Sequence, residues 1–110
     1  MQTYMGVITM TGEILIVYVD ADIKDLIPGF LENRHKDIKT MEESLSIGDY
    51  ETIQGLGHSM KGDGSGYGFD EITQIGSRIE NAAQEENADE IRRQAGELLR
   101  YLENIEVVYE

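Results

Sequence analysis

Residues 69–105 read FDEITQIGSRIENAAQEENADEIRRQAGELLRYLENI, and this stretch decides the fold. Apolar residues recur in it every three or four positions, first as Phe69, Ile72, Ile75, Ile79 and either Ala82 or Ala83, then as Ile91, Ala95, Leu98, Leu102 and Ile105. That spacing places the apolar side chains of each half on one face of an α-helix. Asn87 with Glu90 three residues later matches a capping box, which starts the second helix. The stretch therefore predicts two amphipathic helices joined by a short loop.

The residues before this stretch show the same periodicity twice. Apolar positions from Ile23 to Leu45 predict one long helix, or a short helix feeding a long one. Pro28 favours the second form, because proline is tolerated in the first turn of a helix and not in its interior. A further helix follows Asp49, with Ile53, Leu56 and Met60 as its buried stripe. Such helices cannot bury their apolar faces separately, so we predict a mainly α fold, an up-down four-helix bundle with a short N-terminal helix.

Both ends of the chain have the composition of strands. Residues 13–19 and 105–109 are rich in β-branched and aromatic residues, so we predict a small strand pair formed by the chain ends. Residues 1–12, with a possible turn at Thr11-Gly12, are either an extra strand or a loose tail. The expected organisation is one domain, with residues 1–19 as an N-terminal tail and strand and residues 20–110 as the bundle with its C-terminal strand.

Charge and cysteine content narrow the function classes. The 110 residues include 9 Lys and Arg against 22 Asp and Glu, a net charge of −13, and no cysteine. Such a surface repels phosphate backbones and anionic lipid, so neither nucleic acid nor a membrane is an expected partner. Disulfides and thiolate chemistry are excluded. The longest apolar run, Ile14 to Val19, is too short to span a bilayer. We expect a cytoplasmic, free-standing monomer.

One histidine stands out within the helix that follows Asp49. At 100° per residue, His58 lies about 160° from Leu56 and Met60, so its side chain should face solvent. Gln54, Lys61 and Gly62 share its face, at spacings of three and four residues. Six of the 12 glycines fall within residues 55–68, although each glycine in a helix costs about 1 kcal/mol relative to alanine. No carboxylate occurs in residues 52–62. This pattern predicts an exposed histidine on a face that another molecule approaches closely.

These residues carry a specific resemblance. The run His58-Ser59-Met60-Lys61-Gly62, followed by Gly68, Ile72 and Ile79-Glu80, resembles the signature of histidine-containing phosphotransfer (HPt) domains of bacterial phosphorelays. The resemblance covers roughly residues 20 to 104. The chain differs from the family pattern in having Gly57 where alanine is common, Met60 in place of leucine, and an unusually glycine-rich turn at residues 63–67.

The resemblance implies a phosphoryl carrier, which is a substrate of the relay and not an autonomous kinase. His58 would accept a phosphoryl group from a receiver aspartate or a kinase and pass it to a response regulator, with Lys61 stabilising the phosphoryl group. Partner docking is assigned to Gln54, Gly57, Gly62, Ser65 and Gly68. The implied partners are response-regulator receiver domains and a sensor or hybrid histidine kinase. The chain would bind no cofactor or metal of its own, since Mg²⁺ and the catalytic acids would belong to the receiver.

Other interpretations remain at this point. The main alternative is a helical module that docks a receiver or kinase without accepting phosphate, because a glycine-rich patch without carboxylates favours docking in either case. His35 has no comparable surroundings and is taken as an ordinary surface residue. The glycines do not form a phosphate-binding loop, because the pattern Gly-x-x-x-x-Gly-Lys-Ser/Thr is absent and Lys61 precedes the glycines of residues 62–68. The turn that starts at Asp63 resembles half of a calcium-binding loop, but Gln74 stands where that loop needs a bidentate glutamate.

Overall fold

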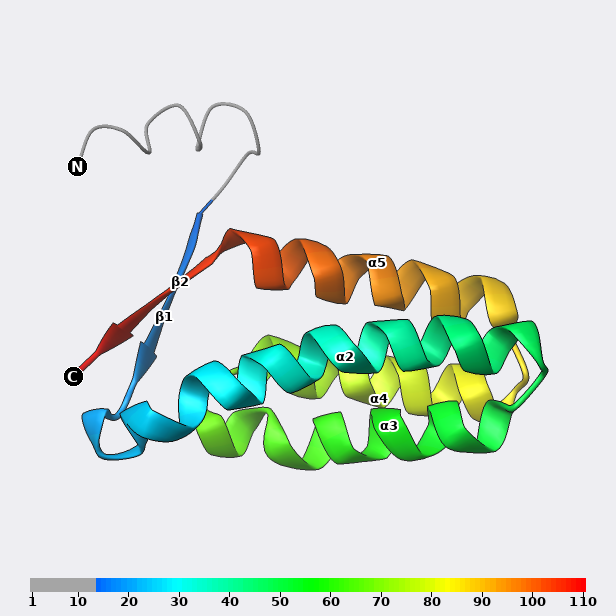
Figure 1. Ribbon diagram of the computed structural model, residues 1–110, viewed down its shortest axis with the longest axis horizontal. Helices are drawn as coiled ribbons and strands as arrows, with labels where there is room; N and C mark the ends of the chain where they lie inside the picture. The colour runs from blue at the N-terminus through cyan, green and yellow to red at the C-terminus, as the bar shows by residue number, and fades with distance from the viewer. Residues whose placement is uncertain (1–13) are drawn as a thin grey trace.

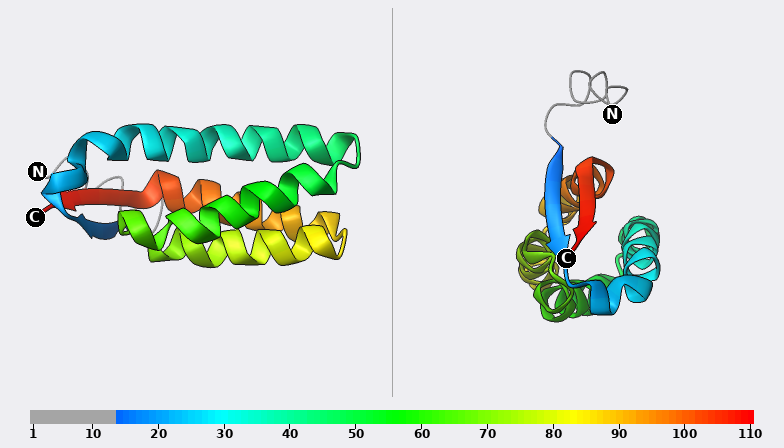
Figure 2. Two further views of the ribbon diagram at one scale, coloured as in Figure 1. Left: turned by 90° about the horizontal axis from the view of Figure 1, so that it is seen from below. Right: turned by 90° about the vertical axis from the view of Figure 1, so that its left-hand side faces the viewer.

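Four α-helices and a pair of short strands make up the computed structural model, which describes residues 14–110 (Figure 1). The order along the chain is β1 (Leu15–Val19), the 3₁₀ helix η1 (Ala21–Leu26), α2 (Ile27–Ser46), α3 (Tyr50–Asp63), the 3₁₀ helix η2 (Ser65–Tyr67), α4 (Asp70–Gln84), α5 (Ala88–Asn104) and β2 (Ile105–Tyr109). The helices run alternately up and down, and the end-on view shows them around a common core (Figure 2). The predicted four-helix bundle with a short N-terminal helix is confirmed.

The helices begin at the residues that the sequence provides as caps. The Asp49 carboxylate accepts from the Thr52 backbone N–H at 3.1 Å, and the Asn87 amide oxygen accepts from the Glu90 backbone N–H at 3.1 Å. Both bonds satisfy a donor that the first turn leaves free. Pro28 lies in the first turn of α2, which it opens as predicted. The connections between α2 and α3 and between α4 and α5 are short, so the two helices of each pair lie side by side and antiparallel.

The core draws apolar side chains from all four α-helices. Its largest fully buried members are Phe69, Ile27, Met41, Ile53, Met60, Ile72, Ile75, Ile79, Ile91 and Leu98, together with Val19 of β1. Most of them are residues of the predicted stripes. Leu56 is an exception, because it is only partly buried while Gly57 takes a buried place on α3. Within residues 14–110, no helix combines the length and apolar composition that crossing a bilayer requires.

The two strands pair in parallel, with Leu15 opposite Ile105 and Val19 opposite Tyr109. This confirms the predicted strand pair. β1 leads into η1 at the end of the bundle where α2 begins, and β2 extends from α5 toward that same end. The two strands therefore run parallel (Figure 1). The alternatives stated for residues 1–12 fall outside the described residues.

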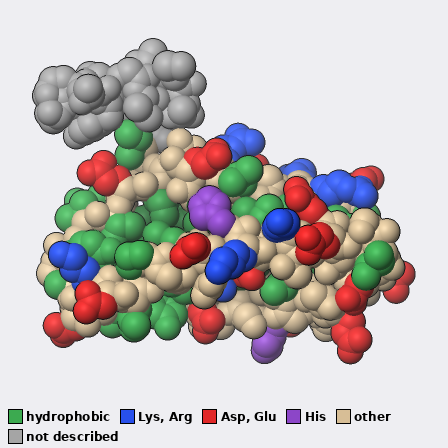
Figure 3. Space-filling model, viewed as in Figure 1, with side chains coloured by type: hydrophobic (Ala, Val, Ile, Leu, Met, Phe, Trp, Pro, Cys, Tyr) green, Lys and Arg blue, Asp and Glu red, His purple; other side chains and the backbone are tan. Residues whose placement is uncertain are grey.

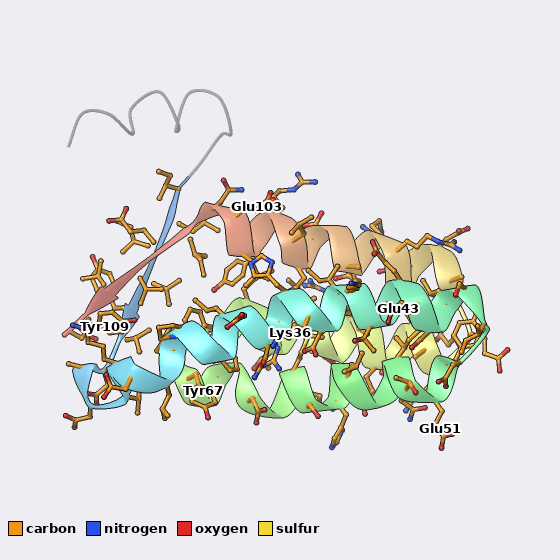
Figure 4. The ribbon with its side chains drawn as sticks, in the orientation of Figure 1. Lys36, Glu43, Glu51, Tyr67, Glu103 and Tyr109 are labelled. Carbon is orange, nitrogen blue, oxygen red and sulfur yellow. The ribbon has the colours of Figure 1, made fainter. Side chains whose placement is uncertain are left out.

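The connection between α3 and α4 closes the end of the bundle beneath the strands. Tyr67 lies in this connection (Figure 4), and its ring packs against Phe30 of α2 with the ring centroids 4.5 Å apart. Gly68 then ends η2 with a φ of 97°, a left-handed conformation that favours glycine. A Cβ added to Gly68 would lie 3.5 Å from the carbonyl oxygen of Tyr18 in β1. The backbone of Gly68 therefore packs against β1.

Candidate functional site

His58 stands on the exposed face of α3, as its position relative to Met60 predicts. Its side chain is 73% exposed. The Nδ1 atom lies 3.0 Å from Oε2 of Glu80 on α4. An ionised carboxylate can only accept hydrogen bonds, so Nδ1 carries the proton of this bond. In the neutral ring, the unprotonated nitrogen is then Nε2, with its lone pair directed away from Glu80.

Glu80 also contacts the neighbouring cation of α3. Its Oε1 atom lies 3.4 Å from Nζ of Lys61, and its side chain is only 13% exposed. The hydrogen bond from His58 holds the pKa of the Glu80 carboxyl below its usual 4.5, against the raising effect of desolvation, and Lys61 adds to the lowering. Glu80 is therefore ionised at neutral pH, and one carboxylate orients both His58 and Lys61.

Two glycines set the distance between α3 and α4. A Cβ added to Gly57 would lie 2.6 Å from the backbone nitrogen of Glu80 and 2.8 Å from the carbonyl oxygen of Gly76. A Cβ added to Gly76 would lie 2.6 Å from the backbone nitrogen of Lys61. The two backbones are thus in direct contact at the level of His58. This contact brings the Glu80 side chain within reach of both residues on α3.

The end of α3 is held by a hydroxyl of α4. Oγ1 of Thr73 donates to the carbonyl oxygen of Lys61 at 3.1 Å and accepts from the backbone N–H of Ser65 at 2.8 Å. The Ser65 hydroxyl lies 3.1 Å from the same Oγ1 atom. These bonds satisfy backbone groups that the helix end leaves free. They fix the last turn of α3, which carries Lys61.

A shallow hollow of about 450 Å³ lies beside the histidine ring, lined by Glu51, Gln54, Gly55, His58 and Glu80. Figure 4 shows Glu51 pointing away from the bundle. The expectation of a patch without carboxylates is therefore wrong for the folded protein. It considered residues 52–62 alone, whereas α4 supplies Glu80 and the first turn of α3 supplies Glu51.

The sequence matches the family model described as Hpt domain over residues 25–107, which is about three-quarters of the 110 residues. The chain belongs to the Hpt domain family. No match was found among curated proteins or among solved structures. Hpt domains are histidine phosphotransfer modules of phosphorelay signalling, and they are phosphocarriers that work with receiver and kinase partners.

Within this Hpt domain, two of the predicted site residues, Lys61 and Gln54, lie close to the His58 ring. Lys61 shares Glu80 with His58, and Gln54 lines the same hollow. Gly62 is exposed, and a Cβ there would meet nothing within 4 Å. Gly62 therefore leaves open space one helical turn from the histidine.

The other three predicted docking residues have contacts inside the Hpt domain. Gly57 is buried against α4, which corrects its assignment to the exposed docking face. The error came from taking Leu56 as the residue that faces the core. Ser65 is exposed but bonds to Thr73, and Gly68 is exposed but contacts β1 through its backbone.

Sequence reasoning assigned no role to Glu80, Gly76 and Thr73. Glu80 appeared only within the motif Ile79-Glu80, where nothing linked it to His58. Gly76 carried a signal that could have been used, since it is a lone glycine on the apolar face of the α4 helix. A glycine at that place indicates close approach of another backbone.

Proposed function

We propose that this Hpt domain carries a phosphoryl group on Nε2 of His58. The observation that supports this most directly is the bond from Nδ1 of His58 to Glu80, together with 73% exposure of the ring. The bond fixes the proton on Nδ1 and leaves the Nε2 lone pair free on the solvent side. An exposed, oriented and neutral imidazole is a competent nucleophile near neutral pH.

The proposed step is a displacement at phosphorus. The Nε2 lone pair of His58 attacks the phosphorus of an aspartyl phosphate on a receiver domain. The N–P bond forms as the P–O bond to the aspartate breaks, and the aspartate carboxylate leaves with the electron pair. Transfer to a response regulator is the reverse displacement by its aspartate. The Nδ1 proton stays on the ring, and the positive charge of phosphorylated imidazole is balanced by Glu80.

Lys61 is proposed to stabilise the phosphoryl group. Its side chain is 51% exposed and lies one turn from His58 on the same helix. Such a cation can neutralise charge on the transferred oxygens, and phosphoryl transfer depends mainly on positioning and charge stabilisation. We propose that Mg²⁺ and the acids that bind it are supplied by the receiver.

The hollow beside His58 is proposed as part of the receiver-docking surface. Gln54 and Gly55 line it, and Gly62 adds open surface one turn beyond the ring. Glu51 also lines it and adds a negative charge, so we propose that the partner presents a cation or a hydrogen-bond donor there. Which receiver and kinase serve this domain is set by such surface positions.

Phosphoryl transfer to the purified domain tests the proposal. The full chain is mixed with an acetyl-phosphate-charged receiver, and His58→Gln is compared with His35→Gln as the matched control. We expect acid-labile, base-stable phosphate on the unmodified chain and on His35→Gln, and none on His58→Gln. Equal labelling of both variants would overturn the proposal. Normal receiver binding without any phosphate on the chain would instead support the alternative, a docking module that is not phosphorylated.

A further inference from the structure

Lys61 is held by α4 at three points along its length. Oγ1 of Thr73 donates to the Lys61 carbonyl oxygen at 3.1 Å, and Oε1 of Glu80 lies 3.4 Å from Nζ. A Cβ added to Gly76 would lie 2.6 Å from the Lys61 backbone nitrogen, so the two backbones are in contact there. Thr73, Gly76 and Glu80 follow at spacings of three and four residues, which places them on one face of α4. This face therefore meets the carbonyl, the backbone nitrogen and the ammonium group of one lysine.

The Thr73 hydroxyl uses its whole hydrogen-bonding capacity at this contact. A hydroxyl has one donor and two acceptor lone pairs. The Thr73 hydroxyl donates to the Lys61 carbonyl and accepts from the Ser65 backbone N–H at 2.8 Å and from the Ser65 hydroxyl at 3.1 Å. In a continuing α-helix, the Ser65 N–H would itself bond to the Lys61 carbonyl four residues earlier. Thr73 thus lies between these two backbone groups and completes the last turn of α3 from outside.

A buried glycine lets the end of α3 rest directly on α4. A Cβ added to Gly64 would lie 2.5 Å from the Thr73 backbone nitrogen and 2.6 Å from its Oγ1 atom. Threonine is branched at Cβ, which restricts rotation of its side chain. The hydroxyl therefore has little freedom, and it fixes the position of the Lys61 carbonyl relative to α4.

The ion pair at the end of the side chain would not hold Lys61 by itself. Its contact with Glu80 is 3.4 Å long and its side chain is 51% exposed, and exposed pairs of this kind contribute little free energy. On the face that Figure 3 shows, Lys and Arg side chains stand among Asp and Glu side chains at the surface in the same way. The lysine stem is flexible. The region that Nζ can occupy therefore depends on where the Lys61 backbone is held.

We propose that Thr73 is a positioning residue for phosphoryl transfer and acts through the backbone of Lys61. Its hydroxyl holds the last turn of α3 against α4, so that the Lys61 ammonium group stays within reach of a phosphoryl group on His58. Such a reaction depends mainly on positioning and charge stabilisation. The inference rests on the proposed function, because it gives Thr73 a part in transfer to His58.

Removal of the hydroxyl alone tests the proposal. Thr73→Val keeps the branched shape, and Thr73→Ser keeps the hydroxyl. Rapid-quench transfer from an acetyl-phosphate-charged receiver, measured at several receiver concentrations, separates the saturating rate constant from the half-saturating concentration. We expect Thr73→Val to lower the rate constant about threefold without changing the half-saturating concentration, and Thr73→Ser to recover most of the rate. An unchanged rate constant, or a change confined to the half-saturating concentration, would overturn the proposal.

The route through Lys61 is tested in a second background. Lys61→Ala has no ammonium group to position, so the added Thr73→Val substitution should not slow transfer further. Non-additivity of this kind is the signature of two residues that act together. A second loss of about threefold in the double variant would show that Thr73 acts by another route and would contradict the proposal.

A threonine at the other end of α3 provides the matched control. The Thr52 hydroxyl donates to Oδ2 of Asp49 at 2.6 Å, so Thr52→Val removes a hydroxyl bond from the same helix far from Lys61. We expect both valine variants to unfold at a lower temperature and only Thr73→Val to slow transfer. Equal slowing in both would assign the effect to helix stability and overturn the proposal.

The same assay separates this inference from the proposed function. If the unmodified chain takes up no phosphate on His58, the proposed function fails and the role of Thr73 fails with it. If the unmodified chain and Thr73→Val take up phosphate at equal rates, the proposed function stands and only the role of Thr73 is refuted.

Discussion

Nδ1 of His58 on α3 lies 3.0 Å from Oε2 of Glu80 on α4. This relationship links the chemistry of the imidazole to the packing of two helices. The carboxylate decides which ring nitrogen carries the proton, and it reaches the ring only because the α3 and α4 backbones touch at Gly57 and Gly76. A small change in that contact should therefore change the reactivity of an exposed side chain.

Removal of the Glu80 carboxylate should slow phosphoryl transfer to His58. Glu80→Ala frees Nδ1, so the ring no longer holds its proton there, and a fraction of Nε2 becomes protonated and unreactive. We expect the rate constant for phosphate acceptance to fall about tenfold, or about 1.4 kcal/mol, with a smaller loss for Glu80→Gln because its amide oxygen can still accept. Rapid-quench transfer from a charged receiver measures the rate.

The ring itself provides the control for this prediction. The ¹⁵N shifts of His58 should show one tautomer, protonated at Nδ1, in the unmodified domain and a mixture in Glu80→Ala. Glu85→Gln removes a charge at the C-cap of α4, where no contact with His58 is present in the described structure, and it should change neither the tautomer nor the rate. A Glu80→Ala domain that transfers at the full rate would contradict the role of Glu80 as a positioning residue.

The contribution of Glu80 to stability should depend on pH. The folded-state pKa of Glu80 is lowered from 4.5, chiefly by the hydrogen bond from His58. The stabilisation is therefore fully present above the unfolded-state pKa and is lost as the pH falls through the folded-state value. The difference in unfolding free energy between the unmodified domain and Glu80→Gln should be larger at neutral pH than well below 4.5. Urea titrations at both pH values measure it, and a larger difference under acid conditions would show the opposite sign of linkage.

Lys61 should matter for transfer more than for folding. Its contact with Glu80 is 3.4 Å long and its side chain is 51% exposed, so its loss should cost less than about 1 kcal/mol of stability. We expect Lys61→Ala to keep its helical circular dichroism and to accept phosphate about tenfold more slowly. Lys61→Arg retains the charge and should recover most of the rate. Loss of the helical signal in Lys61→Ala would mean that this residue is structural.

The phenol of Tyr101 should titrate at an unusually high pH. Burial raises the pKa of its phenol to about 12, and the carboxylates of Glu71 and Asp70 add to the increase. Because the neutral phenol is the favoured form in the folded state, the stabilisation is present below the usual value of 10 and is lost as the pH rises through about 12. Ultraviolet titration of phenolate should show a late step that is absent in Tyr101→Phe. A late step that remains in this variant would assign it to another tyrosine.

The fold was predictable because its determinants are local in sequence. The three-and-four spacing of apolar residues, the caps at Asp49 and Asn87 and the position of Pro28 each act within one helix. The parallel direction of the strand pair was not predicted, since it depends on where α5 ends relative to η1. The position of α5 relative to η1 depends on tertiary packing, and the sequence of neither strand indicates it.

The candidate site was predictable only on the helix that carries it. His58, Lys61 and Gln54 share a face by helical geometry alone, and the structure keeps them together. Glu80 lies 22 residues from His58 in the sequence, and its contribution depends on the distance between two helices. That distance depends on Gly57, whose burial was missed because Leu56 was placed at the centre of the apolar face.

Gly57 and Gly55 should respond in opposite ways to the same substitution. A Cβ at Gly57 would lie 2.6 Å from the backbone nitrogen of Glu80, and backbone atoms cannot move aside as a flexible side chain would. Gly57→Ala should therefore push α4 away and lower the free energy of unfolding by about 1–3 kcal/mol. A Cβ at Gly55 meets nothing within 4 Å, so Gly55→Ala should raise stability by up to about 1 kcal/mol through helix propensity.

The same pair separates the two possible roles of Gly57. If its role is to hold α3 against α4, then Gly57→Ala should weaken the bond between Glu80 and Nδ1 of His58, so that the ring loses its single tautomer even before any partner is added. If Gly57 instead contacted a docking receiver, the free domain would keep both its stability and its tautomer, and only receiver binding would weaken. Thermal unfolding and ¹⁵N spectra of the isolated domain decide between these outcomes. We expect both to change in Gly57→Ala, because the buried backbone contact lies directly beneath Glu80.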